Sequence, residues 1–390
     1  MSHPQVAGEG RLASGSDLDG TACHPGAAME QRLHVFLGTK AQYIKTAPLL
    51  RLMDERGVDY RLIDSGQHAD LASSLRAELG VRQPDHVLGG AGDVDTVPQA
   101  LRWSAGLAAR LGSPSWLRRE VFGSAGGICI VHGDTPSTLL SALMARRAGL
   151  RVAHLEAGLR SHSLLHPFPE EAIRLLVMRW SALLFAPTPG AVANLAHLGV
   201  RGRVVDVGAN TSIEAVAASA RGGTGEPGPV VVSMHRVENL YSGKVVHRFV
   251  ELLLRLAVER PVRFVVHGPT QDVLARKGAI ERLERAGVDL RSLASHGDFI
   301  SWLRAAPFVI TDGGSIQEEC ALLGVPTLLW RARTERPDGL GANVVLSRYE
   351  PAVVEAFLAD PERLRRHPAA LGIRPSERIL EVLQEELQEG

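Results

Sequence analysis

The chain has 390 residues, of which 45% are hydrophobic and 22% charged, and its 43 Lys and Arg balance its 43 Asp and Glu. This length suits two α/β domains better than one, and the composition excludes a disordered or fibrous chain. The neutral charge argues against a nucleic-acid partner. A membrane partner is not expected either, because no stretch approaches the roughly 18 apolar residues that a spanning helix needs.

The cysteine and histidine pattern argues against a metal. Cys23, Cys129 and Cys320 lie far apart, and the 15 histidines show none of the usual ligand spacings. We therefore predict no catalytic metal, no cofactor and a reducing, cytoplasmic setting. Residues 1–31 are rich in Gly, Ala, Ser and His without periodicity, and we predict a disordered leader there.

From His34 onward, short apolar runs alternate with longer helical patterns, which predicts parallel, doubly wound sheets. A first Rossmann-like domain is expected over residues 32–208, with strands at 34–37, 61–64, 128–131, 152–155, 183–186 and 204–207. Residues 209–229 include a Gly- and Pro-rich run and predict a hinge-like linker.

A second Rossmann-like domain is expected over residues 230–374, with strands at 230–233, 263–266, 308–311 and 327–330. The amphipathic stretch 375–390 predicts a last helix, which we expect to pack back on the first domain. The predicted fold class is therefore α/β, with two facing doubly wound domains and an active site in the cleft between them.

Carboxylates stand where the first domain's strands end. Open parallel sheets bind ligands beyond the carboxyl ends of their strands. Asp134 and Glu156 follow two such strands, and Glu170 opens a helix after Pro169. They suit removal and return of a proton at carbon, provided that burial raises the pKa of one of them. Alternatively, Asp134 caps the helix beginning near residue 136, and Glu170 lies in an exposed first turn.

In the second domain, Gly313, Gly314 and Ser315 precede a helix and predict a cradle for a diphosphate, because the helix N-terminus offers free N–H donors. A tight turn without a ligand is the alternative. Glu319, one turn further on, would reach a ribose diol, unless it is an ordinary exposed helix residue.

Cations complete the predicted site. His235 and Arg236 follow the strand at 230–233 and suit a phosphate, although a packed histidine beside a solvated arginine is the alternative. Lys40 and Lys45 add positive charge from the first loop and helix, although a lysine such as Lys45 commonly lies on a solvated face.

Taken together, the motifs resemble the non-hydrolysing UDP-N-acetylglucosamine 2-epimerase family, which has a glycosyltransferase-B-like fold. The similar segments are HGDT at 132–135, HLEAGLR at 154–160, PEE at 169–171, HRVEN at 235–239, SIQEE at 315–319 and TERP at 334–337. The resemblance implies a homodimer that reversibly epimerises C2 of UDP-N-acetylglucosamine or a close UDP-sugar, by anti elimination of UDP to a glycal and re-addition.

Carried over residue by residue, the resemblance implies catalytic roles for a carboxylate set and a histidine: Asp134, Glu156, Glu170 and His235. It implies UDP or substrate binding for the residues Lys40, Lys45, Arg174, Arg236, Gly313, Gly314, Ser315 and Glu319. Which carboxylate acts on which face of the sugar stays open.

Three departures from the family pattern bear on the substrate. Lys40 and Gln42 stand where the family reads Arg and Glu in GTRPE, and the TDSGG serine is replaced by Gly313. Ala69 replaces the arginine of a QHR motif with which many members bind a second, activating UDP-sugar. These changes leave open both the sugar and activation by substrate, and they suggest a different hexose in polysaccharide or secondary-metabolite synthesis.

Three other functions are compatible with the same motifs. A hydrolysing epimerase would trap the glycal with water and release free sugar and UDP. A glycosyltransferase would use the same two domains with an acceptor and without exchange of the C2 hydrogen. A catalytically silent UDP-sugar sensor would bind the ligand alone.

Overall fold

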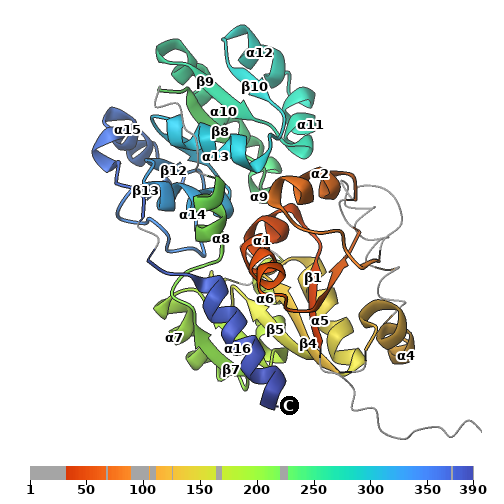
Figure 1. Cartoon of the computed structure of the whole chain (residues 1–390). Helices are drawn as coiled ribbons and strands as arrows, with labels where there is room; N and C mark the ends of the chain where they lie inside the picture. The colour runs from red at the N-terminus through yellow and green to blue at the C-terminus, as the bar shows by residue number, and fades with distance from the viewer. Residues whose placement is uncertain are drawn as a thin grey trace, which may run out of the picture.

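The structure, a computed structural model, describes residues 32–66, 69–88, 105, 111–124, 126–163, 169–219, 227–369 and 372–389, without the side chains of 69–73 and 237. Two α/β units are stacked one on the other, each built on a parallel sheet (Figure 1). The predicted α/β class is therefore confirmed. The predicted leader and residues 220–226 of the predicted linker lie outside the described residues.

The first sheet has seven parallel strands with the doubly wound order expected of such a fold. Across the sheet they are β3 (His86–Val87), β2 (Tyr60–Asp64), β1 (Arg32–Leu37), β4 (Gly127–His132), β5 (Arg151–Leu155), β6 (Leu183–Ala186) and β7 (Arg203–Asp206). Its helical segments are α1 (Lys40–Glu55), α2 (Ala69–Leu79), α4 (Pro114–Trp116), η1 (Leu117–Phe122), α5 (Pro136–Ala148), α6 (Glu170–Trp180) and α7 (Pro189–Leu198).

Both faces of this sheet are buried, because successive strand residues point to opposite sides. Ile128 and Ile130 of β4 pack on the side of α1, whereas Cys129 and Val131 pack on the side of α5. The near-continuous apolar runs in the sequence follow from this double burial.

The second sheet has six parallel strands and the same winding. They are β10 (Asp289–Arg291), β9 (Val262–Val265), β8 (Val230–Ser233), β11 (Val309–Thr311), β12 (Thr327–Leu329) and β13 (Val344–Leu346). Its helical segments are α9 (Val237–Leu240), α10 (Gly243–Glu259), α11 (Gly268–Arg276), α12 (Ala279–Arg285), α13 (His296–Ala305), α14 (Gly314–Leu323), α15 (Pro351–Ala359) and η2 (Glu362–Leu364).

The ten strands predicted from the sequence are present, with ends that differ by two residues at most. Three strands were missed: β3, β10 and β13. Each has two or three residues and pairs along one side only, at a sheet edge. A strand this short carries too little periodicity to be recognised.

The chain passes between the two domains twice. Within the predicted linker, Ser212–Ser219 form helix α8, which lies between the domains and contacts α1 as well as α13 and α14 (Figure 1). The second passage leads to the last helix, α16 (Pro375–Glu389), which lies against the first sheet.

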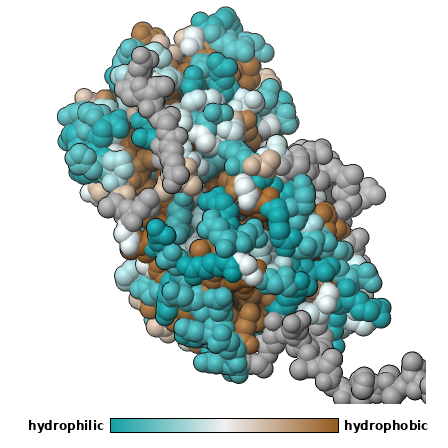
Figure 2. Space-filling view, in the orientation of Figure 1, coloured by the Kyte–Doolittle hydropathy of each residue, from teal (hydrophilic) through white to brown (hydrophobic). Residues whose placement is uncertain are grey.

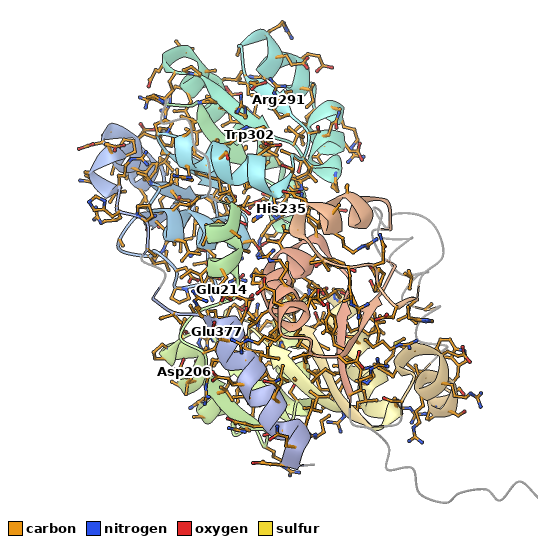
Figure 3. All side chains as sticks on the ribbon, in the orientation of Figure 1. Asp206, Glu214, His235, Arg291, Trp302 and Glu377 are labelled. Carbon is orange, nitrogen blue, oxygen red and sulfur yellow. The ribbon has the colours of Figure 1, made fainter. Side chains whose placement is uncertain are left out.

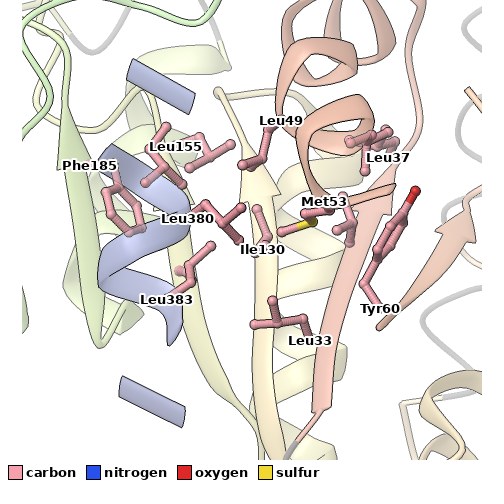
Figure 4. Packing of buried hydrophobic residues seen from close by; sticks show 14 of the residues in the cluster. Leu33, Leu37, Leu49, Met53, Tyr60, Ile130, Leu155, Phe185, Leu380 and Leu383 are labelled. Carbon is pink, nitrogen blue, oxygen red and sulfur yellow. The ribbon is translucent and has the colours of Figure 1, made fainter. Parts of the chain in front are cut away.

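Helix α16 completes the core of the first domain. Ile379, Leu380, Val382 and Leu383 are buried in the same cluster as residues of β1, β4 and β6. Figure 4 shows Leu380 and Leu383 beside Leu155, Ile130 and Phe185. The C-terminal segment is therefore part of the hydrophobic core of a domain that the chain left about 170 residues earlier.

Hydrophilic residues are spread over both domains on the face that Figure 2 shows, and hydrophobic ones appear there in small areas. Among the described residues, none of the helices combines the length and the apolar character needed to cross a bilayer.

We predict that Leu380→Ala lowers the free energy of unfolding by about 3 kcal/mol, because it removes a fully buried side chain and leaves a cavity. Urea unfolding followed by circular dichroism measures the change. Val258→Ala is the control, since Val258 is 87% exposed, and it should change stability by less than about 0.5 kcal/mol. Equal effects of the two substitutions would contradict the core role of α16.

Candidate functional site

The carboxyl ends of the two sheets meet at the domain junction, where the residues after β4 and β5 face those after β8 and β11. Figure 3 places His235, which follows β8, at the boundary of the second domain with the first. Ion pairs cross this boundary, including those between Lys45 and Glu318 and between Arg336 and Glu156. The residues predicted from strand ends are thus brought to one region.

Four buried charged side chains form a ring at this junction, two from each domain. Lys45 Nζ lies 2.6 Å from Glu156 Oε2 within the first domain, and Arg336 Nη1 lies 3.0 Å from Glu318 Oε2 within the second. Across the boundary, Lys45 Nζ lies 3.2 Å from Glu318 Oε2, and Arg336 Nη2 pairs with Glu156 Oε1. Positive and negative charges therefore alternate around this charge ring.

Glu156 has partners on both carboxylate oxygens. Besides Lys45 and Arg336, it accepts a hydrogen bond from Asn210 Nδ2 at 2.5 Å and lies 3.3 Å from His132 Nε2. Burial alone would raise the pKa of Glu156, but Arg336, Lys45 and His132 outweigh it and hold this pKa well below its usual range. Glu156 is therefore a permanently charged carboxylate.

The backbone at Glu156 is also unusual, with φ at 65° in the left-handed region that non-glycine residues rarely adopt. Such a conformation persists where surrounding contacts over-determine it, and functional sites are where this occurs most often. The contacts of Glu156 with residues of both domains hold its backbone in this conformation.

Asp134 belongs to a second charged group. Arg174 of α6 pairs with Asp134 through Nη2 and lies 2.7 Å from Glu171 Oε2 through Nη1. Arg160 Nε holds the other oxygen of Glu171 at 2.5 Å. Asp134 does not cap α5, since Thr135 does so with its own side chain. The side chain of Asp134 is 24% exposed, so a ligand can reach it.

Glu170 differs from the other two predicted carboxylates because Oε2 is buried and has no hydrogen-bond partner among the described residues. Burial raises the pKa of Glu170, and the neighbouring Asp134 raises it further, while Arg236 of the second domain opposes the shift. Glu170 is therefore more easily protonated than an ordinary glutamate, and it is not the exposed helix residue of the alternative interpretation.

Asp312 fixes the loop that carries His235 and Arg236. Its fully buried carboxylate accepts hydrogen bonds from the backbone N–H groups of both residues at 3.0 Å, and from Asn239 Nδ2 at 2.9 Å. Its Oδ1 also lies 3.4 Å from His235 Nδ1. Burial lowers the pKa of His235, although Asp312 opposes the shift, so the imidazole favours its neutral form.

The turn before α14 consists of two buried glycines that allow side chains to pack closely on the start of the helix. Gly313 is the N-cap of α14 without a side-chain cap, so the first N–H groups of the helix are available to an anion. A Cβ atom added at Gly313 would lie 2.8 Å from His235 Cε1. The glycine therefore allows the imidazole ring to pack over this helix terminus. Ser315 is half-buried in the first turn.

Arg236 is held by the second domain itself. Its Nε donates to Asp312 O at 3.1 Å, and its Nη2 lies 3.3 Å from Glu335 Oε1. Arg331 Nη1 lies 3.2 Å from the other oxygen of Glu335. Burial would raise the pKa of Glu335, but Arg236, Arg331 and Arg336 outweigh it and lower this pKa to about 2.

Lys40 and Glu319 lie apart from the charge ring, near the start of α13. Lys40 Nζ donates to Ala294 O at 3.2 Å, a contact between the domains. Glu319 is buried and lies 3.2 Å from His296 Nε2, whose Nδ1 faces Ser219 Oγ at 3.1 Å. Glu319 is therefore not an exposed helix residue.

Gln42 stands where the family pattern GTRPE has a glutamate, and the hydrogen bonds of its side chain explain this departure. Its carbonyl oxygen accepts from the N–H groups of Gly38 and Thr39, at 2.7 and 3.1 Å. Its amide nitrogen donates to His132 O at 2.7 Å and to Thr138 Oγ1 at 2.8 Å. A carboxylate could not donate, so the amide joins the first loop to the end of β4.

Several residues that contact the predicted site residues in the structure were not assigned from the sequence. Glu318 and Arg336 lie in the segments SIQEE and TERP, and His132 lies in HGDT, but none was assigned to the site. Asn210 lies within the predicted linker. Lys45, which the resemblance assigns to UDP or substrate binding, pairs with Glu156 and Glu318 in the structure.

Within the described part of the chain, no three His, Cys, Asp or Glu residues are grouped so that they could hold a metal ion. The junction presents carboxylates, imidazoles, guanidinium groups and a helix terminus.

Comparison with known proteins identifies close parallels along most of the chain. A family model for UDP-N-acetylglucosamine 2-epimerase matches residues 51–369. A UDP-N-acetylglucosamine 2-epimerase of Methanocaldococcus jannaschii is 25% identical over 374 residues, which cover 90% of this chain and 98% of that protein. A UDP-2,3-diacetamido-2,3-dideoxy-D-glucuronate 2-epimerase of Pseudomonas aeruginosa is 27% identical, with 83% of this chain and 91% of that protein covered.

The fold agrees with these sequence relationships. The crystal structure of the Methanocaldococcus jannaschii UDP-GlcNAc 2-epimerase in complex with UDP-GlcNAc and UDP superimposes with a TM-score of 0.78 at 25% identity. The superposition covers 91% of this chain and all of that one.

We predict that Glu335→Gln lowers the free energy of unfolding at pH 7 by about 3 kcal/mol, because the lowered pKa of Glu335 measures the stability that its charge contributes. That contribution is complete above the usual carboxyl pKa near 4.5 and is lost as pH falls toward a folded-state pKa of about 2. The free energies of unfolding of Glu335→Gln and of the unmodified protein should therefore become more similar as the pH falls below 4.5. Urea unfolding at several pH values measures it.

Glu238→Gln is the matched control, since Glu238 faces the same two arginines at longer distances and is 35% exposed. A loss as large as that of Glu335→Gln would show that burial of Glu335 has no special effect.

Proposed function

Because the chain belongs to the UDP-N-acetylglucosamine 2-epimerase family, we propose that this enzyme catalyses reversible C2 epimerisation of UDP-N-acetylglucosamine or a close UDP-sugar without net hydrolysis. One observation carries the proposal: Glu170, whose pKa is raised, lies near Asp134 on the first domain and opposite Arg236 on the second. Proton-transferring groups therefore face a phosphate-binding surface.

The proposed reaction begins with loss of the C2 proton to a carboxylate. The electron pair of that C–H bond forms a C1=C2 double bond as the C1–O bond to UDP breaks, which leaves a glycal and UDP. In the reverse sense, a UDP oxygen attacks C1 while an acid delivers a proton to the other face of C2. Atoms and charge balance without a metal or a redox cofactor.

Two carboxylates are placed for this exchange. Asp134 is accessible and pairs with Arg174, and burial raises the pKa of Glu170. An enzyme that removes a proton from one face and returns one to the other needs both forms at once. We therefore assign proton transfer to Asp134 and Glu170, and a fixed negative charge to Glu156 that favours positive charge developing at C1.

The departing diphosphate is assigned to the second domain. The N-terminus of α14 at Gly313, Gly314 and Ser315 supplies N–H donors that no side chain caps, and Arg236 supplies a permanent cation beside His235. Glu319, with Lys40 nearby, would meet the nucleoside. The two related proteins named above act on different sugars, so the sugar substituents are best identified with a panel of substrates.

We predict that incubation in heavy water with UDP-N-acetylglucosamine places solvent deuterium at C2 of the recovered UDP-sugars. Proton NMR follows the loss of the C2 signal, and the same assay with other UDP-hexoses defines the preferred substrate. Retention of the original hydrogen across the panel would refute the proposal, and it would favour a glycosyltransferase or a sensor.

The products distinguish epimerisation from hydrolysis. We predict that the two UDP-sugar epimers reach equilibrium while free UDP stays at trace levels, because re-addition requires the glycal to stay bound away from water. Phosphorus NMR measures UDP directly. UDP accumulating in step with free sugar would instead indicate a hydrolysing 2-epimerase.

Replacing the proposed acid should slow chemistry more than binding. We predict that Glu170→Gln lowers kcat for C2 exchange at least about 100-fold, since general acid–base catalysis contributes roughly that much, while affinity for UDP changes little. Isothermal titration with UDP measures the affinity. Glu377→Gln is the matched control, since Glu377 lies in the first turn of α16, far along the chain from the site residues, with its side chain 35% exposed. A full retention of kcat in Glu170→Gln would remove this residue from the mechanism.

A homodimer is a further proposal drawn from the family resemblance. Light scattering of the purified protein decides between one and two copies.

A further inference from the structure

The charge ring combines ion pairs within each domain with ion pairs between the domains. Each domain contributes one cation and one anion, and these two pairs, Lys45 with Glu156 and Arg336 with Glu318, are neutral by themselves. Two additional ion pairs exist only where the domains meet. Separation of the domains would thus leave two neutral pairs, whereas contact joins them into the ring.

The ring also lies where the chain passes between the domains. Asn210, at the start of the first passage, donates to Glu156 Oε2, and Ser212 donates to Glu318 Oε1 at 2.5 Å. The residue between them, Thr211, is buried. The hinge segment is therefore hydrogen-bonded to one anion of each domain. A change in the angle between the domains would alter the hydrogen bonds of both carboxylates.

We infer that Arg336 is a positioning residue that reaches across from the second domain to hold Glu156 in place, so that closure of the domains completes the catalytic carboxylate set. The inference rests on the proposed function, because it assigns Glu156 to that reaction. Arg336 acts through Glu156 and needs no contact with the substrate.

The geometry favours arginine for this task. Separate guanidinium nitrogens contact Glu156 of one domain and Glu318 of the other, with Nη2 on the first and Nη1 on the second. A lysine ammonium is a point charge and could not span both carboxylates in the same way. The pairing also buries four charges, which costs free energy unless every partner is present, so the ring is stable only when complete.

The test compares Arg336→Met with Arg336→Lys and with Arg333→Met. Arg333 lies in the same loop but is exposed, so its replacement controls for the loss of an arginine there. We expect Arg336→Met to lower kcat for C2 exchange about 100-fold, as misplacement of a reacting group commonly does, with KM changed less than about threefold. Arg336→Lys should recover part of kcat, and Arg333→Met should match the unmodified enzyme.

A double variant separates positioning from misfolding. Arg336→Met with Glu318→Gln removes one charge of each sign from the second domain and leaves Lys45 paired with Glu156. It should fold and bind UDP, yet keep the low kcat of Arg336→Met. Recovery of kcat in the double variant would overturn the inference, because it would assign the defect to an unpaired Glu318.

The pH profile is a readout that a purely structural role would not move. Without Arg336, the pKa of Glu156 should rise, so the acidic limb of kcat should shift to higher pH in Arg336→Met. The other charged and titratable groups near Glu156 remain in this variant: Lys45 from α1, His132 from β4, Arg174 from α6 and Glu318 from α14. An unshifted acidic limb together with an unchanged kcat would overturn the inference.

Small-angle X-ray scattering tests domain closure without any assay of activity. Arg336→Met should have a larger radius of gyration than both the unmodified protein and Arg333→Met. If no UDP-sugar undergoes C2 exchange, the proposed function fails, and the scattering result still decides whether Arg336 holds the domains together. Equal radii in all three proteins would contradict that role.

Discussion

The site depends on a buried carboxylate that cannot be stable alone. Glu156 lies at the end of β5 in a left-handed backbone conformation, and its burial would by itself favour the neutral form. Lys45 and Arg336 reverse that preference, and they come from different domains. The charge state of this one residue therefore ties the chemistry of the first domain to the position of the second.

The rest of the junction divides its charges in a similar way. Asp312 and Glu335 hold the cations of the second domain, whereas Glu171 holds Arg174 of the first. These anions have cations beside them, whereas no ion pair of Glu170 is found among the described residues. Glu170 combines an unpartnered oxygen with a raised pKa, which is the combination that a proton-transferring acid needs.

Closure of the two domains has a physical reason in the proposed reaction. A glycal intermediate is exposed to water unless the site excludes it, and a ring of ion pairs that forms only on contact favours the closed arrangement while the intermediate exists. Helix α8 contacts both domains, whereas α16 packs on the first domain alone, so such closure would bend the chain at the two places where it passes between the domains.

The amino-acid sequence by itself determined the alternation of strands and helices, the α/β class and the residues at the strand ends, because burial on both faces of a parallel sheet leaves apolar runs that end in polar residues. The short edge strands β3, β10 and β13 carried no such signal. The partners of Glu156 could not be predicted either: Arg336 is 180 residues away in the chain and follows no strand. Only the packing of one domain on the other decided that Lys45 pairs with carboxylates and that Glu156 is permanently charged. Ion pairing depends on the distance between side chains in space, which the spacing of residues along the chain does not give.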